Sequence, residues 1–387
     1  MPSARSPSVK VNPLVLKWGR ESAGLSLDDV ARRLNTSGDA VAAWETGKKS
    51  PTFHALEVLA SFLKRPLAAF FLPEPPKDKP LPHDFRLLPG TQRVPLSSKS
   101  RLVVRRAQRL QKLARELLTE MGLEVAPATA TAKLASNPEE VANAERERLG
   151  ISVEQQREWK NSHEALRGWR RAIEDENVLV FQFSMPVKEC RGFSLTELDP
   201  PVLVLNAADS VNARIFTLAH EYAHILLRKG GMCLFEEGQI GRDEPPVERF
   251  CNRFAGALLV PLDAMLFDLR GLRVADSGAL ADGDLAALAE HFHVSKYVIW
   301  RRMSTAELVS PDAYWSRLNS WPQEAPAVLK KRKGGPSAAR KCIQQRGRRF
   351  ASIVFEAKHR DVITYRDVTD YLAVGPRHLG RLESLLR

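Results

Sequence analysis

Apolar side chains recur at helical spacing along most of this chain of 387 residues. Stretches with an apolar residue at about every third or fourth position are bounded by Gly, Pro or capping residues, and they lie at 13–34, 100–121, 138–176, 215–227, 247–260 and 284–302. Short apolar runs that suit buried strands are fewer, at 178–183, 192–194 and 202–206. The pattern predicts a mainly α protein with a small β-sheet.

The apolar run at 202–206 follows two prolines and ends at an asparagine. The polar residues Asp209 and Ser210 separate it from the next helix. We interpret this run as a strand at the edge of the sheet, beside that helix. An open edge there would bind an extended peptide by strand addition.

Changes in composition along the chain predict seven segments. They are an N-terminal helix-turn-helix bundle at 13–72, a Pro-rich linker at 73–99, a helical connector at 100–150, an α+β domain at 151–270, a helix-turn-helix-like accessory segment at 280–305, a basic linker at 325–340 and a C-terminal helical extension at 341–387.

The helix predicted at 215–227 contains His220-Glu221-x-x-His224. Two His residues four positions apart project from one face of a helix on successive turns, so they can bind a single metal ion. Zinc is the expected ion, because it accepts neutral imidazole and, with three protein ligands, keeps a fourth position for a water whose pKa it lowers to about 7. Glu221, beside the first ligand, is the expected general base for that water.

A third protein ligand is expected from the helix at 247–260, which Pro261 terminates. Glu248 is the candidate. Asn252, one turn later on the same face, is expected to hydrogen-bond a liganding His and to fix its orientation. The alternative is that Glu248 is an ordinary surface residue of an amphipathic helix.

The residues R-I-F-T-L-A-H-E-Y-A-H-I-L-L and E-R-F-C-N-R-F-A-G-A-L-L-V-P together resemble the ImmA/IrrE family of zinc metallopeptidases. The resemblance extends over residues 160–305 and implies a zincin-like metallopeptidase domain at 151–270. It implies His220, His224 and Glu248 as zinc ligands and Glu221 as the catalytic residue. Cys251 stands where the family usually has Ala, and both side chains are small and apolar.

The N-terminal segment has the pattern of short helices joined by a tight turn. Ser26 is an N-cap with acidic residues after it, and Gly47 stops the third helix. This is the arrangement that helix-turn-helix proteins use in the major groove of DNA. The pattern W-E-x-G-x-x-x-P at 44–51, with the helix that follows it, resembles the Xre/Cro-type repressors.

Two interpretations of this N-terminal domain stay open. Its presumed recognition segment, 37–43, contains no Arg, Lys, Asn or Gln, the side chains that form bidentate contacts to guanine or adenine. Arg32, Arg33, Lys48 and Lys49 are the expected DNA contacts, to phosphates. The alternative is that the fold serves dimerisation or contact with the metallopeptidase domain.

The formal net charge of +12 favours contact with a polyanion without indicating any sequence preference. The basic residues gather in the helix at 100–121 and at 330–349, where nine Lys/Arg occur with no acidic residue. Each stretch is either a solvated surface or a nucleic-acid contact. The chain has no run of 18 apolar residues, no signal peptide and no C-x-x-C, so we expect a cytoplasmic protein with reduced thiols.

The resemblance implies a zinc-dependent endopeptidase that cleaves a specific regulator, such as a repressor or an antitoxin, in stress, toxin–antitoxin or mobile-element control. It also implies a PIN-like toxin as a partner, and a homodimer is a further expectation. The alternative is a DNA-binding transcriptional regulator or antitoxin whose metal site is sensory or structural. Glu221 distinguishes these two hypotheses, because a structural site has no use for an unliganded carboxylate beside the metal.

Overall fold

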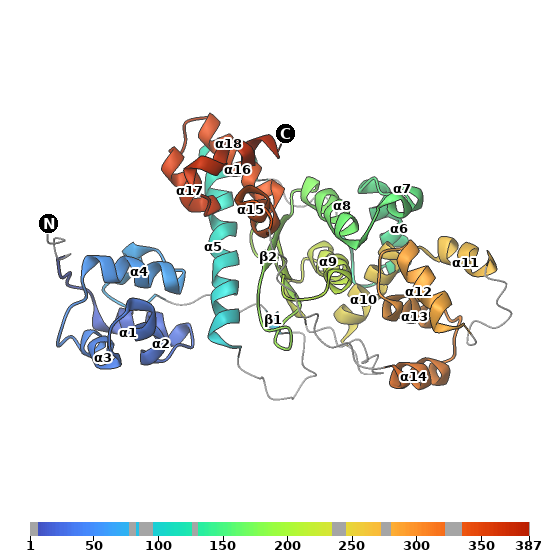
Figure 1. Cartoon of the computed structure of the whole chain (residues 1–387), viewed down its shortest axis with the longest axis horizontal. Coiled ribbons are helices and arrows are strands. Elements are labelled where there is room, and N and C mark those ends of the chain that lie inside the picture. Colours follow the sequence, from blue (N-terminus) through green and yellow to red (C-terminus); the bar gives the residue numbers. More distant parts are fainter. Residues whose placement is uncertain are drawn as a thin grey trace. The chain divides into compact units, whose positions relative to one another are not determined.

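The computed structural model describes residues 7–76, 83–84, 96–125, 131–233, 245–271, 280–321 and 335–386 (Figure 1). The chain divides into two compact units, Met1–Leu81 with Val94–Arg109, and Pro82–Arg93 with Leu110–Arg387. The boundary between them lies inside helix α5 (Ser98–Glu120). Most of the predicted linkers at 73–99 and 325–340 lies outside the described residues, and the predicted division into seven segments remains a prediction.

The first unit is a small helical bundle around one apolar core. Its elements are α1 (Pro13–Ser22), α2 (Leu27–Leu34), α3 (Gly38–Glu45), α4 (Phe53–Leu63) and the 3-10 helix η1 (Leu67–Phe71). The guanidinium of Arg20 on α1 binds both carboxylate oxygens of Glu45 at 2.7 Å. Glu45 belongs to the W-E-x-G pattern, so this pattern serves the packing of α1 on α3.

The second unit holds most of the helices, which confirms the predicted mainly α fold class. They are α6 (Pro138–Arg148), α7 (Val153–Glu158), α8 (Ser162–Asp175), α9 (Val211–Leu226), α10 (Pro246–Leu259), α11 (Leu262–Gly271), α12 (Asp282–His291), α13 (Lys296–Thr305), α14 (Pro311–Ser320), α15 (Ala338–Arg346), α16 (Arg348–His359), α17 (Tyr365–Leu372), η3 (Pro376–His378) and α18 (Leu379–Ser384).

The sheet of the second unit has the strand order β1-β5-β3-β4-β2. The strands are β1 (His83–Asp84), β2 (Leu179–Phe183), β3 (Gly192–Leu195), β4 (Val202–Asn206) and β5 (Gly231–Cys233). β4 pairs in parallel with β2 and antiparallel with β3, so the prediction of an edge strand at 202–206 is wrong. Every residue of β4 is buried, as its continuous apolar run requires of a strand that is covered on both faces.

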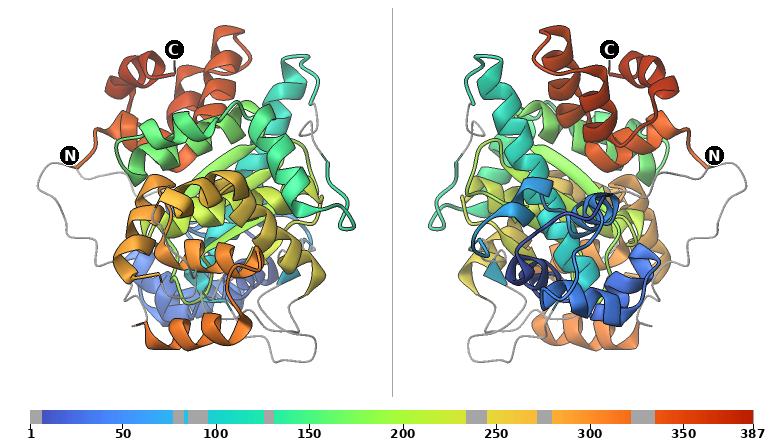
Figure 2. Two further views of the ribbon diagram at one scale, coloured as in Figure 1. Left: turned by 90° about the vertical axis from the view of Figure 1, so that its right-hand side faces the viewer. Right: turned by 90° about the vertical axis from the view of Figure 1, so that its left-hand side faces the viewer.

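The outer edge of β2 is covered by the C-terminal helices. Gly347, between α15 and α16, lies so close that a Cβ atom there would stand 2.7 Å from the carbonyl oxygen of Val180. The guanidinium of Arg170 on α8 donates to the same carbonyl. Helices α15 and α16 contact β2, and α16 also contacts α8, so these two helices protect the edge from pairing with another chain. The C-terminal helices are drawn in red at the top of both views of Figure 2.

A buried carboxylate joins α8 to the C-terminal helices. Glu174 is 3 % exposed, accepts a hydrogen bond from the backbone N–H of Arg348 at 3.0 Å and lies 3.5 Å from the guanidinium of Arg170. Burial raises the pKa of Glu174 to about 7, although the charge of Arg170 and the Arg348 N–H oppose the shift.

This raised pKa predicts a pH dependence of stability. Between pH 4.5, the ordinary pKa, and about 7, the native state binds the proton of Glu174 more tightly than the unfolded chain does. The contribution to stability is therefore complete below pH 4.5 and is lost as the pH rises through about 7. Glu174→Gln should remove a slope of up to about 1.4 kcal/mol per pH unit from the free energy of unfolding. The slope is measured by urea denaturation across this pH range, with Glu147→Gln, a substitution at an exposed position of α6, as the control. Equal slopes in Glu174→Gln and Glu147→Gln would contradict the prediction.

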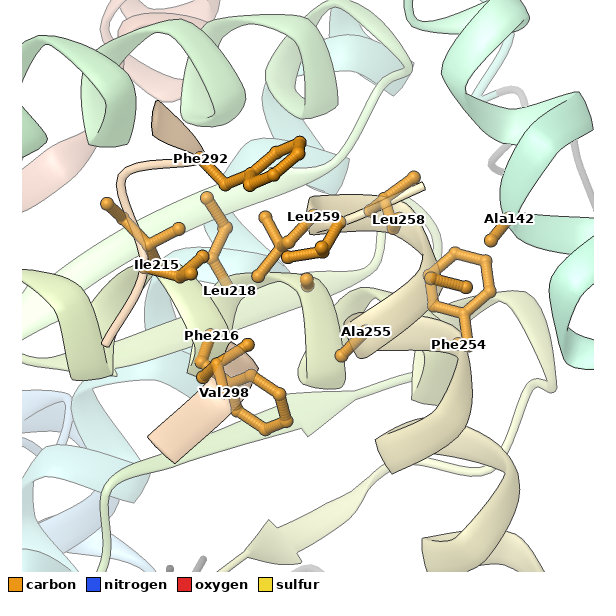
Figure 3. Packing of buried hydrophobic residues seen from close by; sticks show 14 of the residues in the cluster. Ala142, Ile215, Phe216, Leu218, Phe254, Ala255, Leu258, Leu259, Phe292 and Val298 are labelled. Carbon is orange, nitrogen blue, oxygen red and sulfur yellow. The ribbon is translucent and has the colours of Figure 1, made fainter. Parts of the chain in front are cut away.

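The core of the second unit forms where α9 and α10 pack together. Figure 3 shows Leu218 of α9 and Leu259 of α10 beside Phe292, which follows α12. Within the described residues no single helix is long and apolar enough to cross a membrane; α10 and α11 pass that test only together, as a pair bent by 54°.

The accessory helices α12 and α13 belong to this core. In α13 every residue from Tyr297 to Met303 is buried. The guanidinium of Arg302 binds both carboxylate oxygens of Glu139 on α6, at 2.5 and 2.6 Å, and the carbonyl of Val260 at 2.8 Å. Because its second helix is enclosed, this helix-turn-helix-like segment has no face that could enter a DNA groove.

Candidate active site

Helix α9 places three ionisable side chains in the interior of the second unit. It begins at the N-cap Ser210, whose hydroxyl accepts the N–H of Ala213 at 3.2 Å, and every residue from Ala213 to Leu226 is buried. His220, Glu221 and His224 are each at most 2 % exposed. Burying such groups costs free energy unless they bind one another or an ion, so this stretch requires a specific partner.

That partner group is completed by α10. The Nε2 atoms of His220 and His224 lie 3.2 Å apart. Glu248 approaches from α10, with one oxygen 3.3 Å from His220 Nε2 and the other 3.2 Å from His224 Nε2. The structure thus brings together the three residues that the sequence predicted as ligands, and the alternative of a surface Glu248 is wrong because this residue is 9 % exposed.

The size of this triangle fits a zinc ion. Ligand atoms that surround zinc tetrahedrally at 2.0–2.1 Å lie about 3.3 Å from one another. The three measured separations are 3.2, 3.2 and 3.3 Å. Two imidazoles and one carboxylate are also a donor set that zinc accepts with a fourth position open.

The orientation of His224 suits metal binding. Its Nδ1 lies 2.9 Å from the carbonyl oxygen of Lys229 in the turn after α9. An Nδ1–H that donates to this carbonyl leaves the lone pair of Nε2 directed at the other two ligand atoms. The sequence contained no indication of this contact, because it depends on how the chain turns after the helix.

Glu248 is held as a carboxylate. Burial alone would raise its pKa, but the hydrogen bonds and charges of His220 and His224 hold the pKa of Glu248 well below the usual range. Asn252 is buried one turn further along α10, and its role in orienting a ligand remains a prediction. The Cys251 thiol lies beside His224, and burial raises the pKa of this thiol.

The side chain of Glu221 lies against strand β3, beside Gly192 and Ser194. Its carboxylate is fully buried, and burial raises the pKa of Glu221, while the charges of His224 and His220 and the Ser194 hydroxyl lower it. Neither carboxylate oxygen makes a hydrogen bond of normal geometry within the described part of the chain. The carboxylate is thus available to a small polar molecule such as water.

Strand β3 was not recognised from the sequence as part of the site. Gly192 and Ser194 stand two residues apart, on the face of β3 that meets α9. A Cβ atom on Gly192 would lie 2.4 Å from Thr217 Cγ2 and 3.3 Å from Glu221 Cγ. The sequence did contain one indication: two small residues at this spacing in a predicted strand suggest that a helix packs closely on that face.

Gly192→Ala is therefore expected to push α9 away from β3. Overpacking at a buried contact costs about 1–3 kcal/mol, and here the displaced helix carries Glu221. Denaturant unfolding should show this loss, together with a weaker affinity for zinc. Gly283→Ala on α12 is the matched control, because a Cβ atom there meets nothing within 4 Å. A Gly192→Ala protein as stable as this control would contradict the close approach.

Tyr222, next to Glu221, fixes α9 on the side facing α6. Its hydroxyl donates to Glu145 Oε2 at 2.7 Å and accepts from Arg148. Arg148 also binds Glu176, which follows α8. This buried network links α9 to α6 and to the end of α8 and limits the rotation of α9.

The four predicted DNA contacts lie on the first unit, and all are exposed. Arg32 lies near Asp29 at 3.7 Å, and Arg33 stacks over Phe62 at 5.8 Å from the ring centroid. Lys48 and Lys49 lie in the turn after α3, behind Thr46 and Gly47. Their contact with phosphates remains a prediction.

Comparison with known protein families gives one match in each of the two units. Residues 173–304 match the model of peptidase family M78, described as the IrrE N-terminal-like domain, and residues 14–69 match a model of the helix-turn-helix domain. A search of curated proteins gave no match. The two family matches, in this order along the chain, confirm the predicted fusion of a helix-turn-helix domain with a domain similar to the N-terminal domain of IrrE.

Proposed function

We propose that this chain is a zinc-dependent endopeptidase whose site residues are His220, His224 and Glu248 as ligands and Glu221 as general base. The family match supports peptidase activity. The observation that carries the proposal is the triangle of His220, His224 and Glu248, with separations of 3.2–3.3 Å, together with the buried carboxylate of Glu221 next to His220 in the chain.

Zinc held there would supply a Lewis acid for a water molecule and for the carbonyl of the bond to be cleaved. A carboxylate oxygen of Glu221 would accept the proton of the attacking water and return it to the leaving amine nitrogen. Ser194 and Gly192 on β3 set the position of this carboxylate, and His224 is oriented by the Lys229 carbonyl. Glu221 thus has a role in proteolysis and none in a purely structural metal site.

The substrate class that we propose is a single regulatory protein, such as a repressor or an antitoxin. A helix-turn-helix domain on the same chain supports a regulatory role, since it would bring the peptidase to DNA-bound proteins. In this proposal Arg32, Arg33, Lys48 and Lys49 contact phosphates, because α3 carries no Arg, Lys, Asn or Gln for a bidentate contact to guanine or adenine. A PIN-like toxin partner and a homodimer remain predictions from the family resemblance.

The function is tested by comparing protein N-termini in the native host. Cells that lack the chromosomal copy are given either the wild-type chain or Glu221→Gln, and new N-termini are identified by mass spectrometry. We expect new N-termini in one or a few regulatory proteins with the wild-type chain alone. Identical sets of N-termini in both strains would favour the alternative, a DNA-binding regulator with a sensory or structural metal site.

A further inference from the structure

The C-terminal helices α17 and α18 repeat the pattern that begins the helix-turn-helix of the first unit. At the start of α2, the Ser26 hydroxyl accepts the Asp29 N–H at 3.1 Å, and the Asp29 carboxylate accepts the Ser26 N–H at 3.0 Å. At the start of α17, Thr364 and Asp367 make the same two bonds, at 3.3 and 2.8 Å. Both helices therefore begin with a capping box of the same spacing.

The turns after these helices also correspond. Nine residues after the N-cap, Asn35 and Ala373 both adopt the left-handed conformation, with φ of 52° and 51°. The next amide bonds to the carbonyl five residues earlier, at 3.0 Å in the first pair and 3.2 Å in the second. Each turn ends its helix at the same point, and the next helical segment starts three residues after the left-handed residue, at Gly38 and at Pro376.

Apolar residues that face the core stand at the same four offsets in both pairs. They are Val30, Leu34, Val41 and Trp44 in the first pair and Val368, Leu372, Leu379 and Leu382 in the second. In the second pair all four are buried, so the inner faces of α17 and α18 are packed against the core. Their outer faces remain exposed to solvent.

The exposed side chains of the two second helices differ in chemistry. Arg377 and Arg381 are exposed and lie four residues apart, on η3 and α18. The corresponding positions of α3 are Asp39 and Ala43. Arginine is the side chain that most often reads guanine, through a bidentate contact to O6 and N7, whereas Asp39 and Ala43 offer no such contact.

The start of α17 suits contacts to the DNA backbone. Tyr365 is 67 % exposed, and Arg366 beside it is exposed as well, where α2 has Leu27 and Asp28. In helix-turn-helix proteins the first helix of the pair crosses the backbone and supplies phosphate contacts. A tyrosine hydroxyl and a guanidinium are both common donors to phosphate oxygens.

The surrounding helices hold this pair in place and add positive charge. The guanidinium of Arg348 on α16 donates to the carbonyls of Leu385 and Leu386, at 2.5 and 2.7 Å, and so fixes the end of α18. Residues 338–386 contain ten Lys/Arg and five Asp/Glu, whereas residues 13–72 contain eight and six. Of the acidic residues near the second helix, Glu383 is bound to His359 at 2.9 Å, and Asp370 is exposed at the end of α17.

We propose that residues 364–384 form a second helix-turn-helix, which reads base edges of double-stranded DNA through Arg377 and Arg381 and binds phosphates through Tyr365 and Arg366. It supplies the bidentate contacts to guanine that α3 lacks. The pair α12 and α13 has a similar turn, with His293 at φ 53°, but its second helix is buried. Of these three helix pairs, α17 and α18 thus combine an exposed outer face with arginines on the second helix.

The test uses the full-length protein and a pool of randomised DNA duplexes. Duplexes bound by the wild-type protein are enriched and sequenced, and affinities for a selected duplex and for its scrambled version are measured by fluorescence anisotropy at one salt concentration. Three double variants are compared: Arg377→Ala with Arg381→Ala, Lys48→Ala with Lys49→Ala, and Arg167→Ala with Arg171→Ala. The last is a matched control, because Arg167 and Arg171 are exposed, four residues apart, on α8.

We expect one sequence family to be enriched. Arg377→Ala with Arg381→Ala should weaken binding to the selected duplex by about 100-fold or more, at about tenfold per arginine, and to the scrambled duplex far less. Lys48→Ala with Lys49→Ala should weaken binding to both duplexes alike, and the α8 control should bind both as the wild type does. The inference is overturned if no sequence is enriched, or if the preference for the selected duplex survives the loss of Arg377 and Arg381.

Discussion

Glu221→Gln is expected to keep about one zinc per chain and to lose peptidase activity by about 10²- to 10⁴-fold. The substitution preserves the shape of the side chain and spares His220, His224 and Glu248, but an amide cannot accept the proton of the attacking water. Glu221 is buried against β3, and within the described residues its carboxylate makes no hydrogen bond of normal geometry. Replacing the carboxylate by an amide therefore leaves no hydrogen-bond partner without its acceptor. The activity is measured as initial rates on the substrate identified from new N-termini, and the zinc content by elemental mass spectrometry.

Glu248→Gln is the informative comparison for this variant. It makes the same chemical change at a residue whose two oxygens lie 3.2 and 3.3 Å from the imidazoles, so it should weaken metal binding as well as activity. Comparing the two variants distinguishes the role of Glu221, the proposed general base, from that of Glu248, the proposed ligand. Wild-type rates in Glu221→Gln would exclude the mechanism, whatever the metal content proves to be.

His224→Ala is expected to reduce the zinc content from about one ion per chain to a small fraction of that. The substitution removes one of the three proposed ligands and leaves the carboxylate of Glu248 buried beside His220 alone. Zinc stabilises a native state that binds it, so adding zinc to the apoprotein should raise the melting temperature of the wild type and not of this variant. Both quantities, zinc per chain and the zinc-dependent shift in melting temperature, are measured on the same preparations.

His54→Ala provides the control for His224→Ala. His54 is an exposed residue of α4 in the first unit, so its loss removes an imidazole without touching the site. We expect its zinc content and its zinc-dependent stabilisation to equal those of the wild type. Unchanged zinc stoichiometry in His224→Ala would reject the site itself.

The proposed ligand set was predictable because most of its geometry is local. His220 and His224 share one helical face through their spacing alone, and the apolar residues around them indicated a buried helix. Glu248 was accessible to sequence reasoning only as a candidate, since its distance from the imidazoles depends on how α10 packs on α9. The helices α1 to α3, α9 and α10, and the strands β2 to β4, were likewise predicted from periodicity and caps.

The sequence by itself thus determined the candidate donor residues, the mainly α fold and the order of the helix-turn-helix and IrrE-like domains, because spacing, capping and apolar periodicity act over a few neighbouring residues. Only the tertiary structure decided that β4 is internal, that Gly192 and Ser194 face Glu221, and that α13 is enclosed while α18 is exposed. Those outcomes depend on which segments, far apart in the chain, bury their apolar surface against one another. This long-range packing sets the strand order and the face of a helix that stays exposed, and a local sequence pattern does not specify it.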